Sequence, residues 1–168
     1  MQHFRSNGKL LLTAEYLVLD GAKALALPTQ LGQSLSIEPI DSNRIEWKSY
    51  DEQNEIWFKE EFVINELKTS STVPSNSVSE RLLQILKAAL ELNPDFLEND
   101  SGYSIKTQQD FNRHCGLGTS STLINNIAQW ANVDAYVLLE KTFGGSGYDI
   151  ACAHINLQCF IKRSKINR

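Results

Sequence analysis

Alternation of apolar and polar residues predicts strands in the first third of the chain. Residues 9–12 and 24–37 carry apolar side chains interleaved with polar ones, as expected of strands with one buried face. Residues 44–48 alternate in the same way, and the acidic, turn-rich segment 51–55 separates them from the apolar run 56–58. This order predicts a β-hairpin with a solvated turn.

Helical spacing of apolar residues begins after a connector rich in Ser and Thr, residues 69–79. Ser77 and Glu80 have the spacing of a capping box, which marks the start of a helix. The helix has a single apolar face, and we expect it to end at Asn93, directly before Pro94.

The remaining chain alternates between strand and helix signals. A strand is predicted at 103–106, a helix rich in apolar residues at about 119–131, a short helix at about 134–142, and another helix that opens near Asp149. Strands and helices in this order indicate an α+β fold.

Composition and charge place the chain among ordinary globular proteins. It has 168 residues, of which 42% are hydrophobic and 21% charged, which fits about one domain. Its net charge of −4 gives no reason to expect a nucleic acid partner. No apolar run approaches the roughly 20 residues that span a bilayer, and the N-terminus has no signal-peptide core, so no membrane partner is expected.

Cysteine and histidine spacing argues against disulfides and structural zinc. Cys115, Cys152 and Cys159 are odd in number and lack Cys-x-x-Cys spacing, which favours reduced thiols and a cytoplasmic protein. The three histidines are scattered, whereas structural zinc sites repeat Cys and His at fixed intervals.

The strongest chemical signal is the segment 115–122, in which two glycines and four hydroxyl residues open a helix. The free N–H groups of a helix N-terminus favour an anion such as phosphate. A Walker A loop would need a lysine after Gly118, and a dinucleotide fingerprint would need a glycine in place of Ser121. The alternative interpretation is a plain helix start, capped by the hydroxyl of Thr119, Ser120 or Ser121.

Three segments together resemble the GHMP kinases, the family of galactokinase, homoserine kinase, mevalonate kinase and phosphomevalonate kinase. Residues 116–121, Gly-Leu-Gly-Thr-Ser-Ser, resemble the central phosphate-binding motif, usually Gly-Leu-Gly-Ser-Ser-Ala. Residues 8–28 resemble the first motif, a Gly-Lys strand that leads into a Gly-Glu-His turn, and 144–151 resemble the Pro-Ser-Gly-x-Asp loop. The string Gly-Tyr-Asp-Ile-Ala at 147–151 is similar to that of a bacterial group in the mevalonate and phosphomevalonate kinase branch.

The chain departs from the family pattern at several motif positions. Asn7 replaces a proline, Ala14 a glycine, Tyr16 a histidine and Gly145 a proline. Residues 113–115, Arg-His-Cys, stand where a Pro-Gly-Ala-like lead into the phosphate loop is usual. The sequence therefore does not determine which backbone path leads into the phosphate loop.

The resemblance implies a fold and a domain division. Residues 1–157 would form the GHMP kinase N-terminal ATP-binding domain, a ribosomal-protein-like βαβ sandwich of mixed sheet and helices. Residues 158–168 would be an atypical basic tail, and the family's C-terminal ferredoxin-like domain would be absent. Self-association through the surface that this domain would cover is expected of such a chain.

The resemblance also implies an activity, ATP-dependent phosphorylation of a small molecule, with mevalonate or phosphomevalonate as the acceptor. Asp149 would take or orient the proton of the acceptor, and Lys9 would stabilise the developing charge. The resemblance assigns three further roles. The ATP phosphates would be bound by Gly116, Leu117, Gly118, Thr119, Ser120 and Ser121. Mg²⁺ would be bound by Ser120 and Glu140, and the acceptor substrate would lie beside Glu15, Ser146 and Gly147.

Simpler roles stay open for the main candidates. Asp149 would complement the dipole of a helix that begins there, and Lys9 would be a solvated residue of an edge strand. Large aromatic residues such as Trp130, Phe143 and Tyr148 favour core packing over stacking on a nucleotide base. Two other functions also remain, a non-catalytic ATP-binding fragment or pseudo-enzyme and a relative of diphosphomevalonate decarboxylase.

Overall fold

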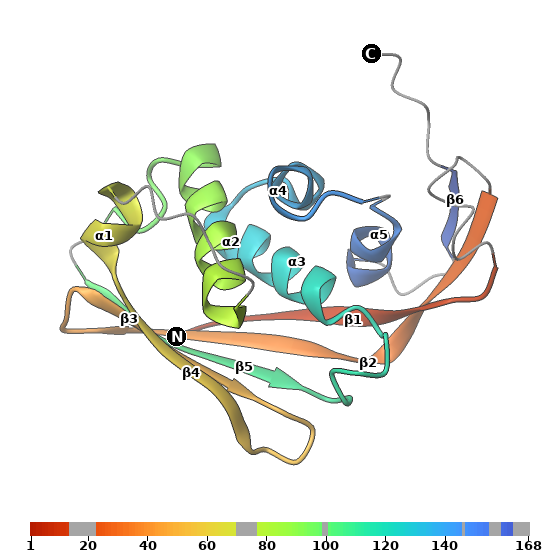
Figure 1. Ribbon diagram of the computed structural model, residues 1–168, viewed down its shortest axis with the longest axis horizontal. Helices are drawn as coiled ribbons and strands as arrows, with labels where there is room; N and C mark the ends of the chain where they lie inside the picture. The colour runs from red at the N-terminus through yellow and green to blue at the C-terminus, as the bar shows by residue number, and fades with distance from the viewer. Residues whose placement is uncertain (14–22, 70–76, 99–100, 146, 155–158, 163–168) are drawn as a thin grey trace.

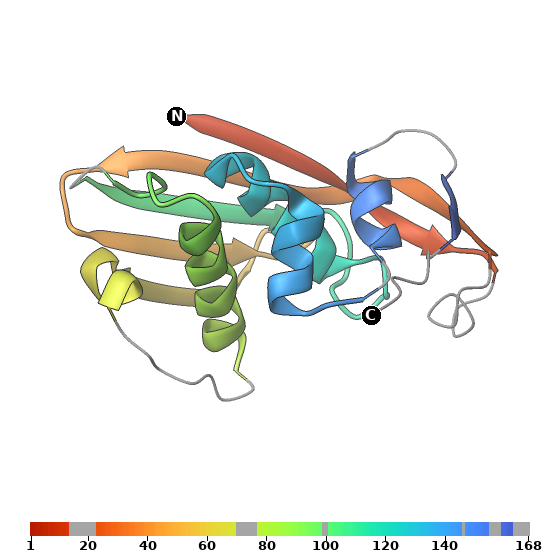
Figure 2. The same cartoon turned by 90° about the horizontal axis from the view of Figure 1, so that it is seen from above.

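The protein folds as one mixed sheet with helices packed on one of its faces. The computed structural model describes residues 1–13, 23–69, 77–98, 101–145, 147–154 and 159–162. The helices of the described residues lie on the same side of the sheet (Figure 1), and Figure 2 shows them from above. In chain order the elements are β1 Gln2–Leu11, β2 Lys23–Ile40, β3 Arg44–Tyr50, β4 Ile56–Val63, α1 Ile64–Thr69, α2 Val78–Leu92, β5 Gly102–Gln109, α3 Thr119–Ala131, α4 Ala135–Thr142, α5 Tyr148–His154 and β6 Cys159–Lys162.

The long strand β2 organises the sheet. The strand order is β1-β2-β5-β3-β4, and the first residues of β2 also pair with β6. β3 and β5 run parallel, while the other pairs are antiparallel. β6 falls within the segment 158–168 that the sequence assigned to a tail, and β1 has a register shift between Asn7 and Lys9.

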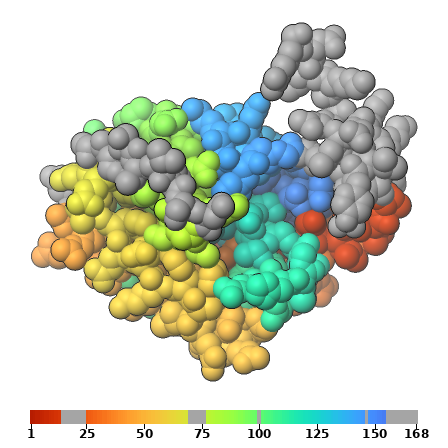
Figure 3. Space-filling view, viewed as in Figure 1, coloured from red at the N-terminus to blue at the C-terminus, as the bar shows by residue number. Residues whose placement is uncertain are grey.

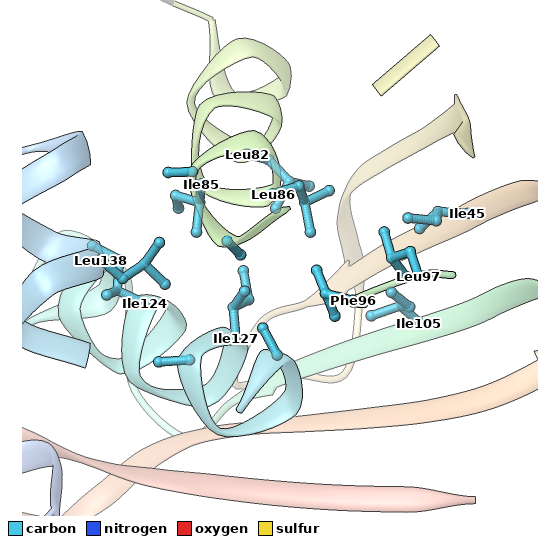
Figure 4. Close-up of a cluster of buried hydrophobic side chains, with 14 of the residues drawn as sticks. Ile45, Leu82, Ile85, Leu86, Phe96, Leu97, Ile105, Ile124, Ile127 and Leu138 are labelled. Carbon is cyan, nitrogen blue, oxygen red and sulfur yellow. The ribbon is translucent and has the colours of Figure 1, made fainter. Parts of the chain in front are cut away.

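The main hydrophobic core lies between the sheet and the helices, and a smaller cluster around Ala26 and Cys152 lies beside α5. The sheet contributes side chains that are at most 2% exposed, Leu35, Ile37, Ile45, Trp47 and Ile105. Leu82, Ile85 and Leu86 of α2 pack against Ile124 and Ile127 of α3, as Figure 4 shows. The aromatic Trp130 packs edge-on against Phe96 and Tyr103, which confirms its expected packing role.

Local sequence signals explain where most elements begin and end. Ser77 and Glu80 form the expected capping box of α2, and Asn93 is the C-cap residue at its other end. Asp134 caps α4 by accepting hydrogen bonds from two backbone N–H groups of its first turn. The predicted hairpin is present as β3 and β4, and the predicted α+β architecture is confirmed. No helix in the described segments is long and apolar enough to cross a membrane.

Buried polar side chains fix α3 on the sheet below it. The amide of Asn126 accepts a hydrogen bond from Ser6 Oγ at 2.7 Å and donates one to the backbone oxygen of Gln33 at 2.9 Å. Asn125 Nδ2 donates to Ser6 Oγ at 2.8 Å, and Thr122 Oγ1 donates to Gln33 Oε1 at 2.8 Å. Because these contacts are directional, they set the rotation of α3 and the position of its N-terminus.

Substituting Asn126 with alanine tests this role. Asn126→Ala is expected to lower the free energy of unfolding by about 1–3 kcal/mol, because Gln33 and Ser6 each lose a buried partner. Urea denaturation followed by circular dichroism measures the change. Gln129→Ala, on the exposed side of the same helix, is the matched control, with an expected change within about 0.5 kcal/mol. Equal effects of the two substitutions would contradict the assigned role.

Candidate phosphate-binding site

The loop before α3 turns through two glycines with left-handed backbone. Gly116 has φ 71°, and Gly118, the N-cap residue of α3, has φ 90°. No side chain caps this helix: Ser121 Oγ and Thr122 Oγ1 donate to the oxygen of Gly118 instead. Capping by a hydroxyl group, the simpler interpretation of the segment, is therefore wrong, and the first N–H groups of α3 remain available to an anion.

Strand β1 holds this loop by close backbone contact. The N–H of Lys9 donates to the oxygen of Leu117 at 2.9 Å. A Cβ at Gly8 would lie 2.9 Å from that same oxygen, and a Cβ at Gly118 would lie 2.9 Å from Ser121 Oγ and 3.2 Å from Lys9 Cγ. Only glycine fits at these two positions without displacing its neighbours.

Lys9 and Asp149 meet although 140 positions separate them in the chain. Lys9 Nζ lies 3.2 Å from Asp149 Oδ1, with side chains 16% and 28% exposed. Lys9 Nζ also donates to the hydroxyl of Tyr148 at 3.2 Å and lies 5.0 Å from the centre of that ring. α5, which begins at Tyr148, packs on β1 and thereby brings the two charged groups together.

Burial and pairing shift the pKa of both charged groups. Burial raises the pKa of the Asp149 carboxyl above its usual value, and the nearby Lys9 ammonium only partly opposes this shift. Burial alone would lower the pKa of Lys9, but Asp149 and the Tyr148 hydroxyl outweigh it, so this pKa is raised. Lys9 is therefore cationic at neutral pH, and Asp149 is a stronger base than an exposed aspartate.

Two adjoining cavities, each of about 430 Å³, open beside the loop. The first, which we call the loop cavity, is lined by Lys9, Arg81, Arg113, Gly116, Gly118, Thr119, Ser120, Ser121, Leu139, Phe143, Gly144 and Asp149. The second, the aromatic cavity, includes Trp47, Trp57, Phe58 and Phe143 in its wall. Both cavities are lined by Arg81, Arg113, Thr119, Ser120 and Phe143. A ligand with an anionic part and an apolar part could occupy both.

The loop before α3 lies on the same face as the β3–β4 hairpin, as Figure 3 shows. Asn112 Nδ2 donates to Glu52 Oε1 of the hairpin turn at 3.0 Å. Asn112 also accepts backbone hydrogen bonds from His114, through its side chain, and from Cys115, through its own backbone oxygen. A compact turn at 112–115 thus takes the place of the Pro-Gly-Ala-like lead.

The structure brings together most of the residues that the sequence indicated. Ser120 is exposed and lines both cavities, and Gly147, with φ 78°, directly precedes α5. Glu140 lies on α4 but is exposed and is not among the described residues of either cavity wall. Glu15 and Ser146 lie outside the described residues. Within the described chain, no three His, Cys, Asp or Glu side chains gather as metal ligands.

Sequence analysis missed three further residues of the site. Arg81 and Arg113 line both cavities, and the hydroxyl of Tyr148 accepts a hydrogen bond from Lys9. Arg113 directly precedes the glycine loop, which was the available signal for a basic residue near a phosphate. Arg81 gave no signal, because a single arginine on the polar side of a helix is ordinary.

No protein-family model matches the sequence, and no protein of curated function matches it. Solved structures do match. They include the Methanococcus jannaschii mevalonate kinase, 19% identical with a TM-score of 0.64, where 83% of this chain covers 46% of that one. The Streptococcus pneumoniae phosphomevalonate kinase is 23% identical with a TM-score of 0.58, and the match covers 91% of this chain and 47% of the kinase. The Lactococcus lactis galactokinase is 14% identical with a TM-score of 0.58, and the match covers 83% of this chain and 36% of the galactokinase.

These matches confirm the expected resemblance at the level of the fold. The neighbours are GHMP kinases, and the chain has the fold of their N-terminal domain. It spans about half the length of the mevalonate kinase and phosphomevalonate kinase structures that it matches.

Proposed function

We propose that this chain forms the ATP-binding part of a GHMP-type small-molecule kinase. The observation that carries the proposal is the Lys9–Asp149 pair, 3.2 Å apart, in the wall of a cavity that also contains the glycine loop and the N-terminus of α3. An anion-binding loop beside a base and a cation is the arrangement that phosphoryl transfer needs, because positioning and charge neutralisation provide most of the acceleration.

ATP would occupy both cavities. The N–H groups of the loop and the first turn of α3, residues 116–121, would hold the phosphates. The aromatic cavity adjoins this position and offers Trp57 and Phe58 to a nucleotide base. The fit is supported by the left-handed Gly118, where a Cβ would meet Lys9 and Ser121 and so prevent the close approach of a phosphate.

Magnesium fits the same site. Mg²⁺ usually takes only one or two protein oxygens in addition to phosphate oxygens, so a cluster of carboxylates is not required. The exposed Ser120, which lines both cavities, supports its assignment as a ligand. Glu140, which lies outside both cavity walls, remains a weaker assignment. When bound, the ion would neutralise charge on the phosphate oxygens.

Asp149 and Lys9 would act on the acceptor. Asp149 would take the proton of the acceptor hydroxyl, or orient it, while the acceptor oxygen forms a bond to the γ-phosphorus and the bond to the ADP oxygen breaks. Lys9 would stabilise the negative charge that develops on the acceptor oxygen. The raised pKa of Asp149 makes it a better proton acceptor, and the raised pKa of Lys9 keeps it charged.

Mevalonate or phosphomevalonate is the acceptor that we favour. The support is the string at 147–151 and the likeness to mevalonate and phosphomevalonate kinases, one of which was solved in complex with phosphomevalonate and AMPPNP. The decarboxylase-like alternative shares the ATP site and differs in the product formed.

Calorimetry with Mg²⁺ and ATP, followed by a coupled assay for ADP, tests the proposal on the 168-residue chain. We expect weak, saturable ATP binding by this chain alone, and ADP release that depends on mevalonate or phosphomevalonate once a GHMP C-terminal domain is joined to it. Binding without turnover by the joined chain would favour the non-catalytic alternative, and release of CO₂ from diphosphomevalonate would favour the decarboxylase-like one. Absence of ATP binding would refute the proposal.

A further inference from the structure

Two arginines from distant parts of the chain converge where the loop cavity and the aromatic cavity meet. Arg81 lies near the N-terminal end of α2, and Arg113 lies in the turn before α3. Both residues are exposed and both line the two cavities. They are therefore accessible to any ligand that extends from one cavity into the other.

An aromatic ring supports each guanidinium group. Arg81 Cζ lies 5.3 Å from the centre of the Phe143 ring, and Arg113 Cζ lies 4.6 Å from that of Trp57. The Nε atom of Arg113 also lies 3.1 Å from His114 Nε2. Such cation–π contacts restrain the arginine side chain while several of its N–H groups stay free to donate.

The charges around the loop cavity do not balance. Three cationic residues line this cavity, Lys9, Arg81 and Arg113. Among the described lining residues the one carboxylate is that of Asp149, which is already paired with Lys9. None of the four ion pairs found among the described residues includes either arginine.

The position of Arg81 on its helix strengthens this point. A cation near a helix N-terminus interacts unfavourably with the helix dipole, so the charge of Arg81 does not stabilise α2 through that dipole. Two uncompensated guanidinium groups beside a glycine loop suit a ligand with several negative charges.

We propose that Arg81 and Arg113 form a clamp that holds the polyphosphate chain of the nucleotide at the junction of the two cavities. The inference rests on the proposed function and extends it, because it assigns two positioning residues in addition to the loop. Arginine suits the role because its planar group can donate two parallel hydrogen bonds to phosphate oxygens.

Binding measurements with three ligands test the clamp: ATP, inorganic tripolyphosphate and adenosine. Arg81→Ala and Arg113→Ala should each weaken the binding of ATP and of tripolyphosphate by about 10- to 100-fold, the range for losing a hydrogen bond to a charged group. The affinity for adenosine, which has no phosphate, should fall by a factor at least about ten times smaller than the affinity for ATP does. Arg81→Lys keeps the charge but not the paired donors, so it should lie between the wild type and Arg81→Ala.

Arg44→Ala is the matched control, because Arg44 is an exposed arginine that pairs with Glu61 on the hairpin. It should leave all three affinities unchanged. Normal ATP affinity in both alanine variants, or equal losses for adenosine and ATP, would overturn the clamp while leaving the kinase proposal intact. Arginine-dependent binding of tripolyphosphate without binding of ATP would refute the nucleotide function and overturn the assignment of the clamp to a nucleotide. Failure of the wild type to bind either anion would overturn both.

Discussion

Gly118→Val is expected to abolish detectable ATP binding while the protein stays folded. Gly118 has φ 90°, a conformation that β-branched residues avoid, and its Cβ would lie 2.9 Å from Ser121 Oγ and 3.2 Å from Lys9 Cγ. The substitution would thus fill the approach to the loop, displace Lys9 and tilt the first turn of α3. Calorimetry with ATP measures the loss, and circular dichroism reports whether the fold is retained.

Gly116→Asn is the control for adding a side chain to the loop away from Lys9. Gly116 also has positive φ, at 71°, but no atom lies within 4 Å of its hypothetical Cβ, and asparagine tolerates the left-handed conformation. Its ATP affinity should fall by less than about tenfold, since asparagine at this position adds little strain. Similar losses in the two variants would show that any side chain in the loop weakens binding, and that obstruction beside Lys9 is not the cause. Unchanged ATP affinity in a folded Gly118→Val would refute the phosphate-loop assignment.

Much of the fold follows from local signals in the sequence. The capping box at Ser77 and the alternation at 44–48 gave the start of α2 and the β3–β4 hairpin, because these features depend on residues close in the chain. The parallel pairing of β3 with β5 was not predictable in the same way. It depends on the packing of α2 across the sheet, which no short segment specifies.

The site was only partly predictable for a similar reason. The glycine loop is contiguous in the sequence, so its left-handed turns and free N–H groups could be inferred from 116–121. The approach of Lys9 to Asp149 was implied only by the family resemblance, since it requires α5 to pack on β1. Arg81 reaches the site because α2 crosses above the β3–β4 side of the sheet. The residues next to Arg81 in the sequence do not indicate that it lies beside the glycine loop.

In a chain that also carries a GHMP C-terminal domain, Asp149→Asn is expected to lower the rate of phosphoryl transfer by about 10²–10⁴-fold, the range for losing a general base. Asparagine keeps the size of the side chain and its position beside Lys9 but cannot accept a proton. Because the glycine loop and α3 are unaffected, the affinity for ATP should change by less than about threefold, well below the tenfold that corresponds to about 1.4 kcal/mol. ADP release with mevalonate or phosphomevalonate measures the rate, and calorimetry measures the affinity.

The pH dependence separates a base from a merely structural aspartate. Asp149 must be ionised to accept a proton, and burial raises its pKa above the ordinary value of 3.8. The wild-type rate should therefore fall as pH decreases through this raised pKa, at a higher pH than an exposed aspartate would give. Lys9, whose pKa is raised above 10.5, should stay charged over that range. The residual rate of Asp149→Asn should lack the acidic decline. Near-normal turnover in this variant, or an unchanged acidic decline, would show that Asp149 only begins α5 and pairs with Lys9.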